Sequence, residues 1–268
     1  MSIGRGSESR FSRLVRALRV GVFFAISPIY LLLTIAACLL TKDVRYWYPL
    51  VRTWSAHSLR WFRIDVVSID ATNIEPGRDY VLLCNHRSHF DIFALFVSMP
   101  HTYTRYVAKR ELTKVPVFGY ALKVSGQILV DRNDHAQAIR ELRKHLGESG
   151  VTVVFFAEGQ RSDDAKLMRF KKGAAAFAID AGLPVVPVAI SGSEAVLEKH
   201  SLMVAPGTIT VRIGQPIETT GFAEEDRDAV TQRAHDEVSA MLNELESASY
   251  RAVTERPTGY SPGAKAHV

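Results

Sequence analysis

Short apolar runs that alternate with helical patterns are the feature that most limits how this 268-residue chain can fold. Apolar runs of this length, several of them rich in β-branched residues, are typical of strands buried on both faces. They cover residues 80–84, 106–108, 128–130, 151–156, 185–190 and 209–213. Strands separated by helices predict an α/β fold in which a largely parallel sheet is flanked by helices.

The helical patterns between and after these runs indicate which faces are buried. Residues 134–146 carry apolar side chains on one face, and residues 174–181 form a second helical pattern that a Gly-Leu-Pro sequence ends. Later, apolar side chains recur at steps of three or four, at Val230, Ala234, Val238, Met241 and Leu245. This spacing predicts a long amphipathic helix packed on the body. The pattern stops after Tyr250, so we expect residues 251–268 to form a flexible tail.

An uncharged apolar segment from Val20 to Thr41 precedes the predicted sheet. As a helix it would be about 33 Å long, enough to cross a hydrocarbon core of about 30 Å. The arginines before it favour a cytoplasmic N-terminus, whereas Pro28 would kink the helix or let it re-enter, so both spanning and re-entry stay open. A signal peptide would have a shorter apolar region, and a buried core helix on a soluble body would show a polar face.

The following segment, residues 46–62, mixes Trp, Tyr and Phe with Arg and His. Such mixing favours the headgroup level of a membrane. We therefore expect residues 1–63 to form a membrane anchor with interfacial helices, residues 64–250 an α/β domain, and residues 251–268 the tail.

The charge distribution supports a membrane partner. The net charge is 33 minus 28, or +5, and residues 1–63 hold ten Lys and Arg against two acids, so the whole basic excess is N-terminal. A basic end beside apolar sequence fits an anionic membrane surface, whereas nucleic-acid binding requires basic residues across the folded body. Cys38 and Cys84 both lie in apolar runs and do not indicate a disulfide, which favours a reducing compartment.

A polar run from Asn85 to Asp91 separates two apolar runs. His86 and Asp91 are five residues apart, so on one regular helix they would point about 140° away from each other. If Ser88 caps the helix, Asp91 becomes the N3 residue of a capping box and His86 lies in the loop above it. The carboxylate can then accept a hydrogen bond from one ring nitrogen of His86 and leave the other nitrogen free as a base.

The same residues allow other interpretations. Asp91 could only cap the helix, with His86 satisfied by backbone groups. His89 could compete as the base, although it would occupy the first helical turn and be partly exposed. Cys84 could be a nucleophile with His86 as its base, although apolar surroundings would raise the pKa of the thiol.

Further polar groups follow the next predicted strands, where the chemistry of parallel sheets collects. The run at 128–130 is followed by Arg132, and the run at 151–156 by Arg161. Two lysines, among them Lys172, stand before the helical pattern at 174–181, where backbone N–H groups favour an anion. Alternatively, these side chains form a solvated basic rim.

The ordered set of motifs resembles the glycerolipid acyltransferase family, of the 1-acylglycerol-3-phosphate (lysophosphatidate) acyltransferase type. The first motif, Asn-His-x-Ser-x-x-Asp, is matched in full by residues 85–91, and the second is similar to residues 126–132. The third, Phe-Pro-Glu-Gly-Thr-Arg-Ser, is similar to residues 156–162, and the fourth, an apolar stretch with a central Pro, to residues 183–188. Ala157 replaces the usual Pro and Gln160 the usual Thr, so we expect a looser turn and altered headgroup contacts.

The resemblance implies an O-acyltransferase of phospholipid synthesis. It would move a fatty acyl group from an acyl thioester to the free hydroxyl of 1-acylglycerol-3-phosphate. We expect His86 to be the general base and Asp91 to fix its tautomer. By the same resemblance, Arg132, Glu158, Gly159 and Arg161 shape the site for the glycerol phosphate, and Lys109 and Lys172 are further candidates for the phosphate.

The expected partners are a lysophospholipid, membrane lipid and an acyl thioester of CoA or acyl carrier protein, with no nucleic acid. We expect no metal and no cofactor, since the sequence has no zinc spacing and no nucleotide-binding loop. The expected location is a cytoplasmic membrane of bacterial type, with the catalytic domain on the cytoplasmic side. The alternatives are transfer to another lysolipid such as lyso-ornithine lipid, a membrane-bound acyl thioester hydrolase, and a non-enzymatic membrane adaptor.

Overall fold

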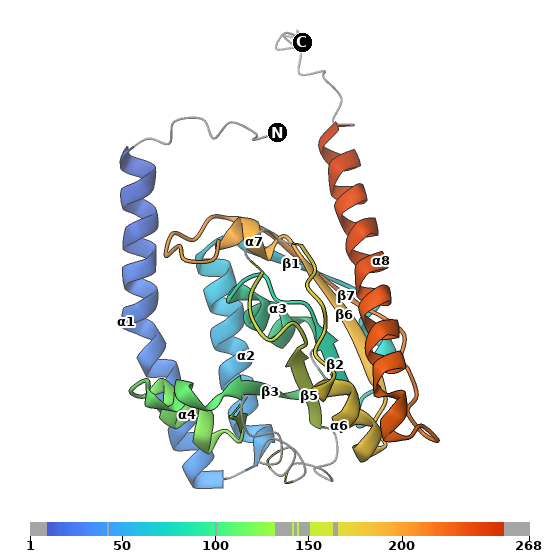
Figure 1. The fold of residues 1–268 in the computed structure, drawn as a ribbon. Helices are drawn as coiled ribbons and strands as arrows, with labels where there is room; N and C mark the ends of the chain where they lie inside the picture. The colour runs from blue at the N-terminus through green and yellow to red at the C-terminus, as the bar shows by residue number, and fades with distance from the viewer. Residues whose placement is uncertain are drawn as a thin grey trace, which may run out of the picture.

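The computed structural model describes residues 10–41, 43–99, 101–131, 141, 144, 151–162 and 166–254. In these residues a seven-stranded sheet in the order β1-β7-β6-β2-β5-β3-β4 lies between helices (Figure 1). All neighbouring strands are parallel except β6 and β7. The predicted α/β fold is confirmed. The strands are β1 (Ile64–Ile69), β2 (Val81–Cys84), β3 (Tyr103–Lys109), β4 (Ile128–Val130), β5 (Val151–Phe156), β6 (Val185–Ser191) and β7 (Gly207–Ile213).

The central strand β2 explains why these runs contain few polar residues. Its side chains alternate between two apolar cores: Leu82 and Cys84 face one, and Val81 and Leu83 face the other. All four are fully buried, as expected for a strand covered on both sides. Every predicted run coincides with an observed strand. β1 lies at the sheet edge and has no continuous apolar run, so the sequence pattern does not predict this strand.

Helices cover both faces of the sheet. α2 (Val44–Trp61) and α3 (Phe90–Ser98) pack on one face with α1 (Arg10–Thr41) outside them, and α6 (Gly173–Ala181) and α8 (Arg227–Thr254) pack on the other. α1 and α8 therefore stand on opposite sides of the molecule (Figure 1). The remaining short elements are α4 (Phe118–Val124), α7 (Ser193–Val196), η1 (Ala71–Asn73), η2 (Arg110–Lys114) and η3 (Glu224–Asp226).

The two helices that the later sequence predicts are present. α6 ends at Gly182, which has a positive φ of 63°. The apolar stripe of α8 is buried on the sheet, as its spacing predicts. α8 continues to Thr254, so residues 251–254 of the predicted tail are helical, and residues 255–268 lie outside the described part of the chain. The helix predicted at 134–146 also lies mostly outside it.

The N-terminal segment forms a pair of helices. α1 is continuous through Pro28 to Thr41, and Asp43 then caps α2 by accepting the Arg45 N–H at 2.9 Å. α2 returns along α1, because Trp61 Nε1 donates to Arg19 O at 3.0 Å near the other end of the pair. The sheet begins directly after this pair, at Ile64.

One face of α1 packs on the body and the other is exposed. Phe23 stacks against Trp54 and also contacts Phe62 and Phe93, while Cys38 is buried in the core. The outward face exposes large apolar side chains: Leu14, Leu18, Phe24, Ile26, Ile29, Leu32, Leu33, Leu39 and Leu40. Among the described helices, α1 is the one long and apolar enough to cross a membrane. Only 22% of its most apolar stretch is buried. It is therefore not a core helix of this fold, and it supports membrane association.

The aromatic residues of α2 divide between the two environments. Trp47 and Tyr48 are buried against the body rather than exposed, and Tyr48 Oη lies 3.0 Å from Thr104 Oγ1 on β3. Trp61 is 44% exposed at the end of α2. Only part of the aromatic set is thus available to lipid headgroups.

Candidate active site

The candidate site lies at the carboxyl end of β2, in the middle of the sheet. β5 runs parallel to β2, so the loops that follow the two strands leave the same edge. Asn85 anchors the first loop to β6. Its Nδ2 donates to Ile190 O at 2.9 Å and its Oδ1 accepts from Ile190 N at 2.8 Å. The buried amide side chain therefore holds the start of the loop against the sheet.

His86 and Asp91 form the predicted pair. His86 Nδ1 lies 2.8 Å from Asp91 Oδ2, with the imidazole 14% exposed and the carboxylate fully buried. The ring also stacks on Phe156 of β5, at 3.9 Å between ring centroids and 20° between planes. These two contacts fix the ring plane. They leave Nε2 as the nitrogen that can take a proton from a substrate.

The start of α3 differs in detail from the predicted capping box. The helix begins at Phe90 with His89 at the N-cap position, and the Ser88 hydroxyl donates to Leu197 O at 3.0 Å. The Asp91 carboxylate nevertheless reaches back, because Oδ2 accepts the N–H groups of Arg87 at 2.8 Å and Ser88 at 2.9 Å. Only the carboxylate half of the capping box forms, and this half is the one that places His86 above Asp91.

Glu158 stabilises the loop that carries His86. Its Oε1 accepts the His86 N–H at 2.7 Å and its Oε2 accepts the Met168 N–H at 3.1 Å, so its oxygens are directed at the backbone. Burial raises the pKa of this carboxyl, and the two N–H donors oppose that rise. Gly159 has a φ of +75°, a left-handed backbone conformation that favours glycine at this turn.

The departures in the third motif have different consequences. The Ala157 N–H donates to Cys84 O at 2.9 Å, a hydrogen bond that the usual Pro cannot make. The expectation of a looser turn is therefore wrong, since this bond extends the contact between β2 and β5. Gln160 is exposed, and its Nε2 lies 3.9 Å from Met168 Sδ.

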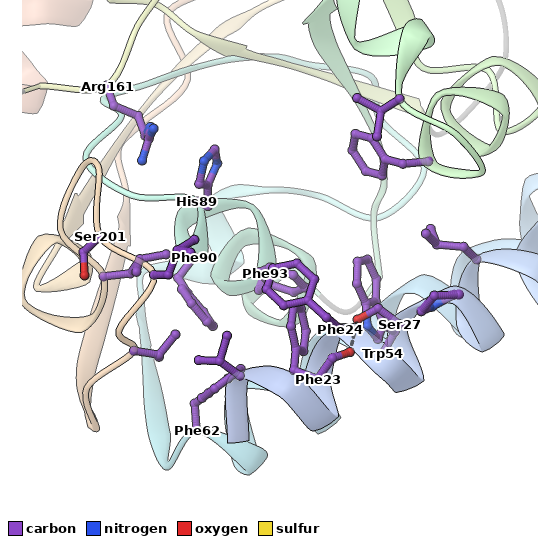
Figure 2. A pocket seen from close by; sticks show the side chains of 18 of the residues that line it. Phe23, Phe24, Ser27, Trp54, Phe62, His89, Phe90, Phe93, Arg161 and Ser201 are labelled. Atoms are coloured by element: carbon purple, nitrogen blue, oxygen red, sulfur yellow. Dashed lines mark hydrogen bonds between the residues drawn. The ribbon is translucent and has the colours of Figure 1, made fainter. Parts of the chain in front are cut away.

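A largely apolar cavity of about 630 Å³ opens between α1, α3 and the loop at 197–204. Figure 2 shows Arg161 directed toward His89 at one end and aromatic rings from α1, α2 and α3 along the rest. Burial, followed by the charges of Arg161 and His86, lowers the pKa of His89. The Ser162 N–H donates to His86 O at 2.9 Å, so the predicted phosphate ligand Arg161 stands near the His86–Asp91 pair, at the polar end of an apolar chamber.

A second apolar cavity of about 250 Å³ lies beside the first and extends toward β3 and α4. The two cavities share Leu31, Trp54, His89, Phe93 and Phe118 as lining residues. His89 therefore touches both compartments, and the site combines one polar end with two apolar spaces.

The structure does not bring every predicted residue to this place. Lys172 Nζ pairs with Asp228 Oδ2 of α8 at 2.6 Å. Lys109 is exposed at the end of β3, and neither lysine lines the two apolar cavities. Among the predicted site residues that the structure describes, Arg161 is the one that lines either of these cavities, and His86 and Asp91 are linked to the cavities through His89, which lies between them in the chain. Arg132 lies outside the described residues. Cys84 is fully buried and burial raises the pKa of its thiol, which argues against the alternative with Cys84 as nucleophile.

Sequence reasoning missed the stacking partner of the base. The sequence pattern places Phe156 in a strand and in the third motif only. In the structure its ring stacks on the imidazole of His86. The signal is the strand register, because Phe156 is the partner of Cys84 in the β2–β5 ladder and so lies next to the loop that follows Cys84.

Comparisons with known proteins identify the family of the chain. Residues 63–191 match the Acyltransferase family. The chain is 31% identical over 208 residues to the 1-acyl-sn-glycerol-3-phosphate acyltransferase of Pseudomonas aeruginosa, covering 76% of this chain and 79% of that one. It is 30% identical over 180 residues to the enzyme of that name from Cocos nucifera, covering 66% of this chain but 58% of the relative's length.

A solved structure shares the fold. The crystal structure of the 1-acyl-sn-glycerophosphate acyltransferase from Thermotoga maritima superposes with a TM-score of 0.73 and 25% sequence identity. The match covers 87% of this chain and 98% of that one. The extent of these matches, together with the His86–Asp91 geometry, shows that the chain belongs to the 1-acyl-sn-glycerol-3-phosphate acyltransferase family.

Proposed function

We propose that the protein transfers a fatty acyl group from an acyl thioester to the free hydroxyl of 1-acylglycerol-3-phosphate. The observation that carries this proposal is the His86–Asp91 pair in the same loop as His89, which lines an apolar cavity together with Arg161. A base supports attack by a hydroxyl, an arginine suits a phosphate, and an apolar chamber suits a fatty chain.

The chain's residues support a direct transfer. His86 Nε2 accepts the hydroxyl proton as the acceptor oxygen attacks the thioester carbonyl. Asp91 stabilises the imidazolium that forms, through the Nδ1 contact. The carbon–sulfur bond then breaks, and the thiolate takes up the proton from His86. The products are the new ester and a free thiol, so no covalent acyl-enzyme is needed.

The cavity can hold both the phosphate and the fatty tail of the acceptor. The planar guanidinium of Arg161 binds two phosphate oxygens at the polar end. The single fatty tail lies along the aromatic side chains of α1 and α3, which bury it without leaving a polar group unpaired. We propose that neither Lys109 nor Lys172 contacts this phosphate, because both stand away from the cavity.

The N-terminal helices set the location of the reaction. We propose that α1 lies along the membrane surface rather than across it, because one of its faces contacts the body from Val20 to Cys38 while the other stays apolar and exposed. A lysolipid can then enter the cavity from the bilayer, and the thioester arrives from the cytosol. The basic N-terminal segment favours the cytoplasmic side.

A transfer assay tests the proposed reaction. The full chain in phospholipid vesicles is incubated with labelled palmitoyl-CoA or palmitoyl-acyl carrier protein and one acceptor at a time: lysophosphatidate, lysophosphatidylcholine, lyso-ornithine lipid or none. We expect labelled phosphatidate with lysophosphatidate, and loss of roughly 10²- to 10⁴-fold of the turnover in His86→Ala. Free fatty acid without any acceptor would indicate a hydrolase, and undiminished turnover in His86→Ala would exclude the mechanism.

A flotation assay tests the membrane contact separately. Leu33→Glu with Leu40→Glu places two negative charges on the exposed face of α1 without touching the packed face. We expect a smaller fraction of the protein to float with anionic vesicles. An unchanged fraction would contradict the surface position of α1.

A further inference from the structure

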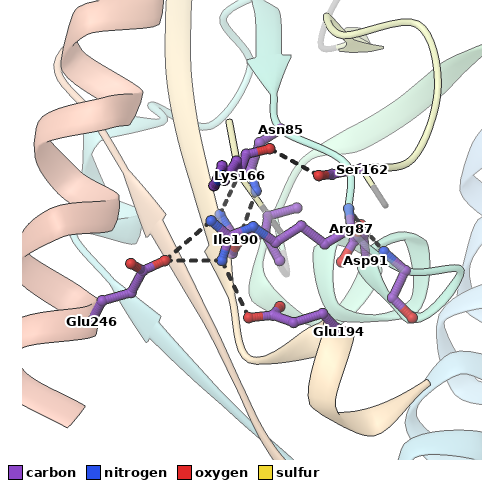
Figure 3. A network of polar contacts seen from close by, with 9 residues as sticks. Asn85, Arg87, Asp91, Ser162, Lys166, Ile190, Glu194 and Glu246 are labelled. Atoms are coloured by element: carbon purple, nitrogen blue, oxygen red, sulfur yellow. Dashed lines mark hydrogen bonds and ion pairs between the residues drawn. The ribbon is translucent and has the colours of Figure 1, made fainter. Parts of the chain in front are cut away.

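We propose that Arg87 is a positioning residue that locks the catalytic loop to the C-terminal helix through Glu194 and Glu246. This inference rests on the proposed function, because it assigns Arg87 a part in holding the His86–Asp91 pair. Figure 3 shows the arrangement, with Arg87 reaching away from the loop toward α7 and α8.

The Arg87 side chain connects three distant segments of the chain. Its Nη1 donates to Glu194 Oε1 of α7 at 3.2 Å and to Glu246 Oε1 of α8 at 3.1 Å, and its Nη2 donates to the same Glu246 oxygen at 3.1 Å. The partners are 107 and 159 residues away in sequence. The guanidinium therefore connects the loop after β2 to α7 and to α8.

Burial makes this contact different from a surface ion pair. The Arg87 side chain is 4% exposed, whereas those of Glu194 and Glu246 are 32% and 53% exposed. A buried guanidinium is unfavourable unless it is paired, so the loop conformation is tied to the presence of the two carboxylates. Arg87 Nε and Glu194 Oε2 are buried without a partner in the described residues, so each side chain depends on its remaining contacts.

The backbone of Arg87 transmits this constraint to the catalytic pair. The Arg87 N–H donates to Asp91 Oδ2 at 2.8 Å, and the same oxygen receives His86 Nδ1. The other oxygen, Oδ1, has no partner among the described residues, so the carboxylate is oriented from one side only. A shift of the Arg87 backbone therefore moves the oxygen that orients the imidazole.

The test compares two glutamates of α8 that are two residues apart. Glu246→Ala removes a ligand of Arg87. The matched control Glu244→Ala removes an ion pair of the same helix with Arg212, which lies on β7 and away from the catalytic loop. Both variants lose one exposed carboxylate of the same helix, and their thermal unfolding shows how far each loss changes stability. Arg87→Ala and Arg87→Lys complete the set.

The variants are assayed as the full chain with palmitoyl-CoA and lysophosphatidate, and their thermal unfolding is measured. We expect kcat to fall about 10- to 100-fold in Arg87→Ala and about 3- to 10-fold in Glu246→Ala, with the KM for lysophosphatidate unchanged, because small misplacement of a catalytic group is costly. Arg87→Lys should recover part of the kcat, and Glu244→Ala should keep it. Equal kcat in Glu246→Ala and Glu244→Ala, or a rise in KM instead of a fall in kcat, would overturn the proposal.

A second readout separates this inference from the proposed function. The rate at which diethyl pyrocarbonate modifies His86 is followed by peptide mass spectrometry in the same variants. We expect faster modification in Arg87→Ala and Glu246→Ala than in Glu244→Ala, whether or not the wild type transfers acyl groups. Absence of transfer in the wild type would refute the proposed function alone, and equal modification rates in the variants would refute the role of Arg87.

Discussion

Replacing Asp91 with Asn tests the electrostatic part of the mechanism with little change of shape. The Oδ2 position accepts three hydrogen bonds, from His86 Nδ1 and the N–H groups of Arg87 and Ser88. An Asn oxygen in that position keeps all three, because each donor carries a hydrogen. The amide NH₂ then takes the Oδ1 position, which is buried and unpartnered among the described residues. The substitution thus removes the charge and keeps the geometry.

The expected magnitude follows from the lost attraction. An imidazolium and a carboxylate with charge centres about 4 Å apart attract each other by roughly 4 kcal/mol at an effective dielectric constant of about 20. Losing that stabilisation in the transition state corresponds to a fall in kcat of about 10³-fold. The unpaired buried NH₂ should lower the free energy of unfolding by about 1 to 3 kcal/mol, which a stable domain tolerates.

The measurement is a steady-state assay of kcat and KM for lysophosphatidate, together with denaturant unfolding of the same preparations. We expect the KM to stay within about twofold, because Asp91 does not contact the acceptor phosphate in the proposed mode. Asp228→Asn is the control, since Asp228 is an acid of α8 that pairs with Lys172 at the start of α6, and neither residue lines the two apolar cavities. A kcat for Asp91→Asn above one third of the wild-type value would refute the electrostatic argument.

Three further predictions concern other residues. Arg161→Ala should raise the KM for lysophosphatidate about tenfold or more, with a smaller change in kcat. The control Lys172→Ala should leave that KM unchanged. Equal KM values for the two variants in steady-state assays would argue against the cavity as the phosphate site. Cys84→Ala should retain kcat within about twofold, because the thiol is fully buried and burial raises its pKa, and a loss of turnover with normal thermal unfolding would revive a thiol route. Burial raises the pKa of Glu158 above its ordinary value of 4.5, so its contribution to the free energy of unfolding is greatest below that value and is lost as the pH rises through the folded pKa. The difference in unfolding free energy between wild type and Glu158→Gln should therefore shift against the wild type from pH 4.5 upward, and a constant difference in denaturant titrations would contradict this.

Much of the fold could be predicted because its signals are local. A strand buried on both faces must be apolar at consecutive positions, and the runs that become β2, β5 and β6 are of this kind. β1 has one face exposed at the edge, so no local run marks it. The length and composition of α1 are also local properties, whereas its packing on the body depends on residues far along the chain.

The contact between His86 and Asp91 was predictable for a related reason. His86 and Asp91 are five residues apart, so a strand end and a helix start within one short loop are enough to bring them together. The detail of the cap was not predictable, since the Ser88 hydroxyl binds the backbone at Leu197, which only the tertiary structure brings near.

The sequence by itself therefore determined the α/β class, the base with its carboxylate, and an apolar N-terminal helix, because each of these is written in residues close together in the chain. Only the tertiary structure decided that Arg161 joins the cavity while Lys172 pairs with α8, that Glu158 braces the backbone, and that Phe156 and Arg87 support the pair. Those outcomes depend on which side chains the sheet order and helix packing place face to face. Local spacing carries no information about contacts made across more than fifty residues.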